Sequence, residues 1–126
     1  MMTWAYVALG GAIGSVFRYL MQTLIGQYAG VDFPYGTLIV NITGSVLMGI
    51  FIGSMARMLP QHAQELRLLI AVGILGGYTT FSSFSLDAIT LLEEGKFMAM
   101  SVYVVSSVVL SLAGLYAGLR LMRMFA

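Results

Sequence analysis

Four long apolar runs, separated by short polar segments, make up almost all of the 126-residue chain. The runs cover residues 4–26, 36–58, 66–92 and 97–122. Each is long enough to cross a hydrocarbon core of about 30 Å as an α-helix. The pattern therefore predicts an all-α integral membrane protein, with residues 1–126 forming a single domain of four transmembrane helices.

The segments between the runs are polar and contain residues that favour turns. Glycine, aspartate and proline occur within residues 27–35, which predicts a turn-forming linker. Residues 60–65 are mostly polar and predict an exposed loop, and residues 93–96 predict a short turn. Four crossings place both chain termini on the same side of the membrane.

The composition supports a membrane location. Hydrophobic residues make up 60% of the chain and charged residues only 9%, compared with roughly a quarter charged in a typical soluble domain. A soluble fold of this size has too much surface to hide such an apolar excess. The 15 glycines suit membrane helices that approach one another closely.

Several classes of function do not fit this composition. A net charge of +1 gives no basic surface for nucleic acid. The chain has no cysteine and only one histidine, His62, so we expect no disulfide, thiol chemistry or zinc site. No histidine, cysteine or paired carboxylates converge, so we do not expect an enzyme. The N-terminus lacks a basic region, and no cleaved signal peptide is expected.

The distribution of basic residues leaves the orientation open. Four arginines lie on the side of the termini: Arg57, Arg67, Arg120 and Arg123. Arg18 and Lys96 lie nearer the other side. This weak bias fits insertion in both orientations, or one orientation with cytoplasmic termini. Because no internal repeat is visible, an inverted two-fold arrangement would require two chains.

The third run contains a segment that suits a helix poorly. Gly76 and Gly77 are followed by a cluster of hydroxyl residues, which offer the backbone alternative hydrogen-bond partners. We expect a local break at Gly76–Thr79 that frees backbone groups, which a membrane interior tolerates only beside protein, water or an ion. The alternative is an intact helix whose glycines pack tightly at a crossing.

Uncharged hydrogen-bond donors also occur within the runs. Asn41 has an amide with two N–H donors, and Ser82 has a hydroxyl. Tyr103, Ser107 and Ser111 are spaced four apart and so share one helical stripe. Donors without carboxylates among them suit an anion, although such groups also form simple hydrogen bonds between helices.

Phe81 and Phe84 are three residues apart and are therefore neighbours on a helix. Their ring edges carry positive potential, which could face an anion, although such rings also pack against lipid or protein. Arg18 lies inside the first run. It could pair with Asp87, reach the membrane interface, or attract anions to a vestibule.

Three sequence blocks occur in order along the chain: Gly10-Gly11-x-x-Gly14 followed by Arg18-Tyr19; Gly36-Thr37-Leu38-x-Val40-Asn41-x-x-Gly44-Ser45; and Gly76-Gly77-Tyr78-Thr79-Thr80-Phe81-Ser82-Ser83-Phe84-Ser85. Together they resemble the motifs of the Fluc (CrcB) family of fluoride channels. The resemblance covers three of the four runs.

This resemblance implies a dual-topology, antiparallel homodimer in the bacterial cytoplasmic (inner) membrane. The dimer would export cytoplasmic fluoride passively through two pathways and confer fluoride resistance. It implies a structural sodium ion (Na+) at the dimer centre, bound by the backbone carbonyls of Gly76 and Thr79 from each subunit.

The resemblance also implies roles for the pathway residues. Asn41 would be the pore-lining amide, and Phe81 and Phe84 the aromatic box that faces fluoride. The fourth helix would carry a hydroxyl track of Tyr103, Ser107 and Ser111. The chain departs from the family pattern at Ser83, where threonine is frequent, and at Leu115, where some members keep a hydroxyl and where the track would end early.

Two other functions are compatible with a small membrane protein of this kind. A small proton-coupled drug exporter needs a titratable carboxylate inside the membrane, but the first run has none and Asp87 lies near the end of its run. A membrane scaffold that transports nothing has no need of the buried amide of Asn41 or of the hydroxyl stripe. A flux measurement on purified protein separates these functions.

Overall fold

The computed structural model describes residues 2–55 and 60–125, and all regular structure within these ranges is helical. Arg57 and residues 56–58 of the second predicted run lie outside the described residues. The helices, in chain order, are α1 (Thr3–Ala29), α2 (Tyr35–Met55), α3 (Pro60–Leu66), η1 (Arg67–Leu75), α4 (Gly76–Tyr78), α5 (Phe81–Glu93) and α6 (Phe97–Arg123).

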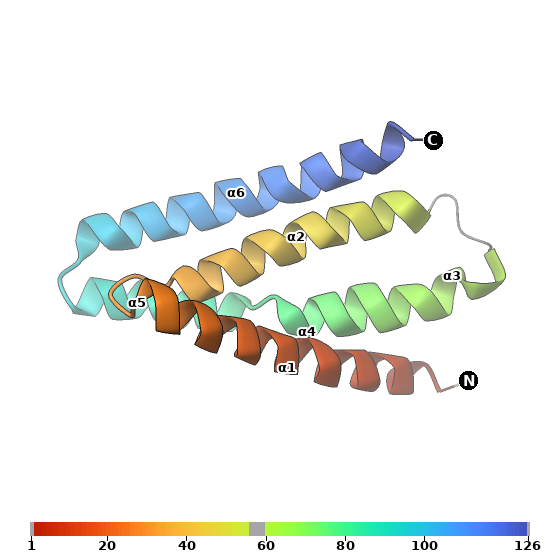
Figure 1. The fold of residues 1–126 in the computed structure, drawn as a ribbon, viewed down its shortest axis with the longest axis horizontal. Helices are drawn as coiled ribbons and strands as arrows, with labels where there is room; N and C mark the ends of the chain where they lie inside the picture. Colours follow the sequence, from red (N-terminus) through yellow and green to blue (C-terminus); the bar gives the residue numbers. More distant parts are fainter. Residues whose placement is uncertain (1, 56–59, 126) are drawn as a thin grey trace.

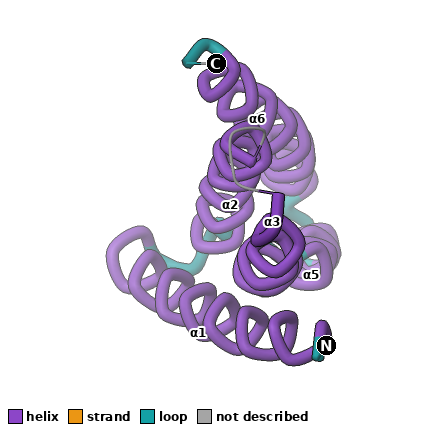
Figure 2. The backbone as a smooth tube through the Cα atoms, turned by 90° about the vertical axis from the view of Figure 1, so that its right-hand side faces the viewer, coloured by secondary structure: helices purple, strands orange, loops and turns teal. Residues whose placement is uncertain are grey.

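The long helices run roughly alongside one another, and both chain ends lie at the same end of the molecule (Figure 1). Helix α2 packs along α6, while α1 packs on η1 and α4. Viewed end-on, α1 and α6 lie at opposite sides, with α2 and the α3–α5 segment between them (Figure 2). The third segment therefore contacts helices on both sides.

Glycines line the closest helix contacts. The only buried residues of α1 are Gly10 and Gly14. A side chain at Gly14 would collide with the backbone carbonyl of Ile74 on η1. Between α2 and α6, a Cβ at Gly118 would lie 2.6 Å from the carbonyl oxygen of Val46. The helices thus touch backbone to backbone, as membrane helices do when close packing takes the place of a hydrophobic core.

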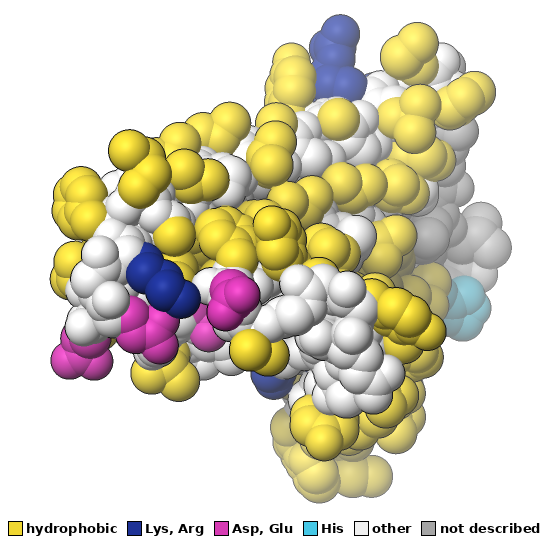
Figure 3. Space-filling model, turned by 60° about the vertical axis from the view of Figure 1, so that its left-hand side comes forward, with side chains coloured by type: hydrophobic (Ala, Val, Ile, Leu, Met, Phe, Trp, Pro, Cys, Tyr) yellow, Lys and Arg dark blue, Asp and Glu magenta, His cyan; other side chains and the backbone are white. Residues whose placement is uncertain are grey.

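The outer surface is strongly apolar. More than half of the side-chain surface of Leu9, Phe17, Val105 and Leu112 is exposed. Hydrophobic side chains cover much of the face in Figure 3, on which the acidic side chains gather in one area. Exposed apolar surface on this scale indicates contact with lipid.

Three segments in the described part of the chain are long and apolar enough to cross a membrane: Tyr35–Met55, Gln61–Glu93 and Phe97–Arg123. The prediction of an all-α membrane protein with several spans is confirmed. Helix α1 is 27 residues long but is not one of the three, because residues such as Arg18 and Gln22 lower its hydropathy. Four crossings remain a prediction.

The polar segment 60–65 is not a loop, contrary to the sequence prediction. It forms α3, which begins at Pro60 and continues directly into the nine-residue π-helix η1. Proline is well tolerated in the first turn of a helix because the missing N–H has no intrahelical partner there. The two turns predicted elsewhere are present, with Gly30 at φ 83° and Gly95 at φ 79°.

Candidate functional site

The third segment is interrupted between α4 and α5. Thr79 has φ −81° and ψ 159°, and Thr80 has φ −152° and ψ 121°, so both are extended. Gly76 remains helical, with φ −64° and ψ −37°. The predicted interruption is therefore confirmed, but it lies at the two threonines and not at the glycine pair.

The threonine hydroxyls explain this position. The Thr79 hydroxyl donates to the Leu75 carbonyl at 3.0 Å. The Thr80 hydroxyl accepts the Ser83 N–H at 3.1 Å and so caps the start of α5. The Leu75 carbonyl also accepts the Thr79 N–H, so the Thr79 hydroxyl adds a second bond at the end of α4, whereas the Thr80 hydroxyl satisfies an N–H that a continuous helix would pair internally.

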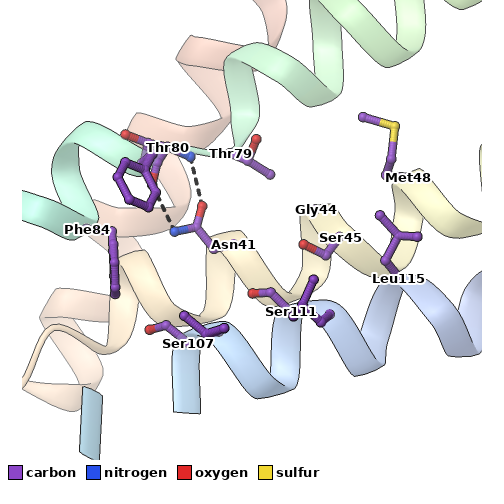
Figure 4. Close-up of a pocket in the computed structure, with 13 residues that line it drawn as sticks. Asn41, Gly44, Ser45, Met48, Thr79, Thr80, Phe84, Ser107, Ser111 and Leu115 are labelled. Carbon is purple, nitrogen blue, oxygen red and sulfur yellow. Dashed lines mark hydrogen bonds between the residues drawn. The ribbon is translucent and has the colours of Figure 1, made fainter. Parts of the chain in front are cut away.

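Asn41 of α2 bonds to the extended backbone from the side. Its Nδ2 donates to the Thr80 carbonyl at 2.9 Å, and its Oδ1 accepts the Thr80 N–H at 2.8 Å (Figure 4). Gly44, one turn further along α2, allows this approach, because a side chain there would collide with the Thr79 methyl group. Only one N–H of the Asn41 amide stays available for a ligand.

Arg18 of α1 bonds to the other end of the break. Its Nε donates to the Gly77 carbonyl at 3.0 Å. The suggested pairing of Arg18 with Asp87 is wrong, because Asp87 accepts a hydrogen bond from Tyr103 instead. The glycine crossing considered as an alternative is also present, since a Cβ at Gly77 would lie 2.8 Å from the Gly11 carbonyl oxygen.

The break removes the helical partners of the carbonyls of residues 76–79, and for Gly76 and Thr79 the lost donor is bonded to a side chain instead. In a continuous helix the Gly76 carbonyl would accept the Thr80 N–H, and the Thr79 carbonyl would accept the Ser83 N–H. Here Asn41 Oδ1 takes the first amide and the Thr80 hydroxyl takes the second. The carbonyls of Gly76 and Thr79 are thus suited to accept an external partner such as a cation.

A cavity of about 390 Å³ lies beside the break, between α2, α5 and α6. Six predicted site residues are among those that line it: Asn41, Thr79, Phe81, Phe84, Ser107 and Ser111. Ser45 lines it as well, and Met48 and Leu115 lie together in the part away from Asn41 (Figure 4). Arg18, Gly76, Ser82 and Tyr103 are not among its lining residues.

Ser107 is the most unusual residue of this cavity. It is 5% exposed, and its Oγ is buried without a hydrogen-bond partner in the described part of the chain. The neighbouring Ser106 instead donates to the Val102 carbonyl of its own helix at 2.6 Å. Leaving a buried hydroxyl unsatisfied costs about 1–3 kcal/mol, so Ser107 has a strong need for a ligand or water in the cavity.

The aromatic residues form a continuous row. The ring centroids of Phe81 and Phe84 are 5.4 Å apart, and those of Phe84 and Tyr103 are 5.3 Å apart. Phe33 of the α1–α2 linker packs edge-on against Tyr103 at 5.6 Å. Phe81 is 76% exposed, so one chain alone does not enclose its ring.

Tyr103 has a different environment from the one predicted. It is fully buried, and its hydroxyl donates to Asp87 Oδ2 at 3.0 Å, so it is not a free donor along a track. Ser82 is exposed, with its Oγ 3.3 Å from the Thr80 hydroxyl. The sequence analysis missed Phe33 and the Asp87–Tyr103 bond. An acidic residue three positions after Phe84 was the only available signal.

Comparison with known proteins gives the family. The model for CrcB-like protein, Camphor Resistance (CrcB), matches residues 5–119. The fluoride-specific ion channel FluC of Agrobacterium fabrum is 51% identical over 119 residues, which is 94% of both chains. The protein of that name in Nitrobacter winogradskyi is 49% identical, over 97% of this chain and 98% of its own.

A third relative, FluC of Rhizobium meliloti, is 51% identical over 117 residues, or 93% of each chain. These relatives are named as ion channels, which confirms the prediction that the chain is not an enzyme. A match to the family model over residues 5–119, together with identities near one half, identifies the relationship. The chain belongs to the CrcB family.

Proposed function

We propose that this chain is the subunit of a fluoride channel, and that the cavity beside the break forms part of the fluoride pathway. The observation that carries the proposal is the buried Ser107 hydroxyl: it has no hydrogen-bond partner among the described residues, and Ser107 is one of the residues that line the cavity. The names of the relatives give fluoride as the ion.

The lining of the cavity suits a small anion. Fluoride holds its water tightly, so a pathway must offer replacement donors of moderate strength at several points. Ser107, Ser111 and the remaining N–H of Asn41 are such donors. No carboxylate occurs among the described residues that line the cavity, so nothing in this lining repels an anion.

Phe81 and Phe84 supply a second kind of contact. Aromatic ring edges carry a partial positive potential that attracts an anion without binding it as firmly as a full cation would. Both rings line the cavity, but Phe81 is largely exposed. We propose that a second copy of the chain covers this ring and completes the pathway.

The freed carbonyls support the proposal of a sodium ion between two chains. Each chain offers the carbonyls of Gly76 and Thr79, so an antiparallel homodimer would offer four. A bound sodium ion would neutralise these carbonyl dipoles and add positive charge near the fluoride pathways. We assign it a structural role.

The direction in which fluoride would move follows from its chemistry. Hydrogen fluoride crosses membranes as a neutral acid and dissociates in the cytoplasm, so a passive channel in the bacterial cytoplasmic membrane lets fluoride leave.

We propose that α1 also crosses the membrane, giving four crossings, and that chains insert in both orientations. The basic residues at the two ends differ too little to favour one orientation.

A matched pair of serine variants tests the proposal. Ser107→Ala removes the unpartnered hydroxyl, whereas Ser106→Ala removes one that bonds its own helix. In liposomes, Ser107→Ala should slow fluoride efflux by roughly threefold to tenfold, the effect of one lost hydrogen bond. Ser106→Ala should match the unmodified protein. Equal efflux from both variants would contradict a role for this cavity.

A proton-coupled drug exporter finds no support in the structure. It requires a titratable carboxylate inside the transport site. Asp87 does not line the cavity and is bonded to Tyr103.

A further inference from the structure

Two side chains from other helices hold the break in the third segment. Asn41 reaches it from α2 and Arg18 reaches it from α1, each at about 3 Å from its backbone partner (Figure 4 shows Asn41). Asn41 uses its oxygen and one of its two N–H groups in these bonds. This is the hydrogen bonding of a structural clamp, and it leaves one N–H of Asn41 for the cavity.

The Asn41 bonds free the Gly76 carbonyl directly. Its Oδ1 occupies the Thr80 N–H, the donor that the Gly76 carbonyl would have in a continuous helix. Its Nδ2 fixes the Thr80 carbonyl from the same side. If this amide were lost, the Thr80 N–H could return to Gly76 and the helix could close.

By holding Thr80, Asn41 also determines where α5 begins. Thr80, held in an extended conformation, places its hydroxyl on the Ser83 N–H and thereby caps α5. The first residue of α5 is Phe81. Asn41 therefore contacts the one residue that separates the freed carbonyls from the aromatic pair.

Arg18 supports the clamp from the other side. Its Nε bonds the Gly77 carbonyl at the C-terminal end of α4, where the backbone dipoles favour positive charge. This bond satisfies the carbonyl next to Gly76 without competing for it. Side chains from α1 and α2 thus bond the Gly77 carbonyl and the Thr80 N–H, while the Thr80 hydroxyl takes the donor of the Thr79 carbonyl.

We propose that Asn41 is a positioning residue that couples the sodium site to the anion cavity. The inference rests on the proposed function, because it takes sodium as the partner of the Gly76 and Thr79 carbonyls. Asn41 is not itself a ligand of the cation. It keeps both carbonyls available and holds the start of α5, so its loss weakens cation binding even without any fluoride present.

Sodium-dependent thermal unfolding of detergent-purified protein tests the coupling. Sodium chloride is titrated against N-methyl-D-glucamine chloride at constant ionic strength. Asn41→Leu, which keeps the branched shape of the side chain but no polar atom, should require roughly tenfold more sodium for half of the stabilisation. The control is Ser54→Ala, which removes a hydroxyl on the same helix that donates to the Ile50 carbonyl of its own backbone. An unchanged sodium midpoint in Asn41→Leu overturns the proposal.

Hydrogen exchange at the Thr80 amide, followed by NMR of selectively threonine-labelled protein, provides a measurement on the unmodified chain. The amide lies outside the helices yet should exchange slowly, because Asn41 Oδ1 accepts it. In Asn41→Gln the side chain is one methylene longer, so its amide no longer matches the Thr80 backbone. This variant should speed exchange of the Thr80 amide at least tenfold. Fast exchange in the unmodified protein overturns the clamp.

The two measurements separate the clamp from the proposed function. If the unmodified protein shows no sodium-dependent stabilisation, the sodium site fails and the coupling fails with it, while the exchange rate still decides the clamp. If sodium stabilises the protein and Asn41→Leu slows fluoride efflux without moving the sodium midpoint, Asn41 acts on the anion directly and the coupling is wrong.

Discussion

The hydroxyl of Tyr103 on α6 donates to a carboxylate oxygen of Asp87 on α5 at 3.0 Å. This bond joins the two helices that carry the serine stripe and the aromatic pair. Tyr103 is fully buried, and its ring packs at a tilt of 41° against that of Phe84. The position of the Phe84 ring therefore depends on the Tyr103–Asp87 bond, and the sequence pattern did not identify Asp87 as the acceptor.

Removing the acceptor should loosen this contact. Asp87→Leu leaves the buried Tyr103 hydroxyl without its Asp87 partner and should reduce the free energy of unfolding by about 1–3 kcal/mol, the cost of leaving a buried polar group unsatisfied. Asp87→Asn keeps an acceptor and should cost less. Thermal unfolding of purified protein in detergent measures both. Equal melting temperatures for Asp87→Leu and the unmodified chain would contradict the bond.

The aromatic pair should control the rate of efflux. Phe81→Ile and Phe84→Ile remove the ring edges but keep apolar side chains, and each should slow fluoride efflux from liposomes by roughly threefold to tenfold. Assembly should persist, which size-exclusion chromatography of the detergent-solubilised variants can check. Unchanged efflux in both variants would remove these rings from the mechanism.

Leu115 should limit the hydroxyl stripe of α6. It lies one turn beyond Ser111 and lines the cavity beside Met48, so the donors stop there (Figure 4). Leu115→Thr adds a hydroxyl at this position and should speed fluoride efflux by roughly twofold to fivefold. Leu110→Thr is the control, because Leu110 lies on the same helix and does not line the cavity. Equal rates for the two variants would contradict a pathway along this side of α6.

Gly44 should be required for the break. A methyl group there would collide with the Thr79 side chain, so Gly44→Ala should destabilise the protein by about 1–3 kcal/mol through overpacking. Gly26→Ala on α1 meets nothing within 4 Å and should be neutral or stabilise by up to about 1 kcal/mol. Thermal unfolding compares the two, and a stable Gly44→Ala protein would argue against the close approach of α2 to Thr79.

The apolar runs predicted the helices well, because the lengths and composition of membrane helices are determined by the bilayer alone. Polar residues were a poorer guide to their structure. Residues 60–65 form a helix despite their polarity because they extend the start of the apolar, packed helix η1. The π-helix η1 has no recognisable sequence pattern and was not predicted.

The sequence predicted which residues line the candidate site more accurately than it predicted their hydrogen-bond partners. Residue types indicated Asn41 and Ser107 as donors, and both line the cavity. The sequence could not show that Asn41 bonds Thr80 or that Tyr103 bonds Asp87, because tertiary packing decides which partners come within reach. The break lies at the threonines and not at the predicted glycines for a similar reason. Asn41 and the Thr80 hydroxyl bond the backbone N–H groups of Thr80 and Ser83 there, and the sequence does not reveal these tertiary and capping bonds.

Fluoride flux through the purified protein tests the central claim most directly. Liposomes that contain the unmodified chain are loaded with potassium fluoride, and efflux is recorded with a fluoride electrode after a potassium ionophore is added. Chloride-loaded liposomes serve as the control. The account predicts rapid fluoride release, with chloride held as in protein-free liposomes. Fluoride release no faster than from protein-free liposomes would contradict it.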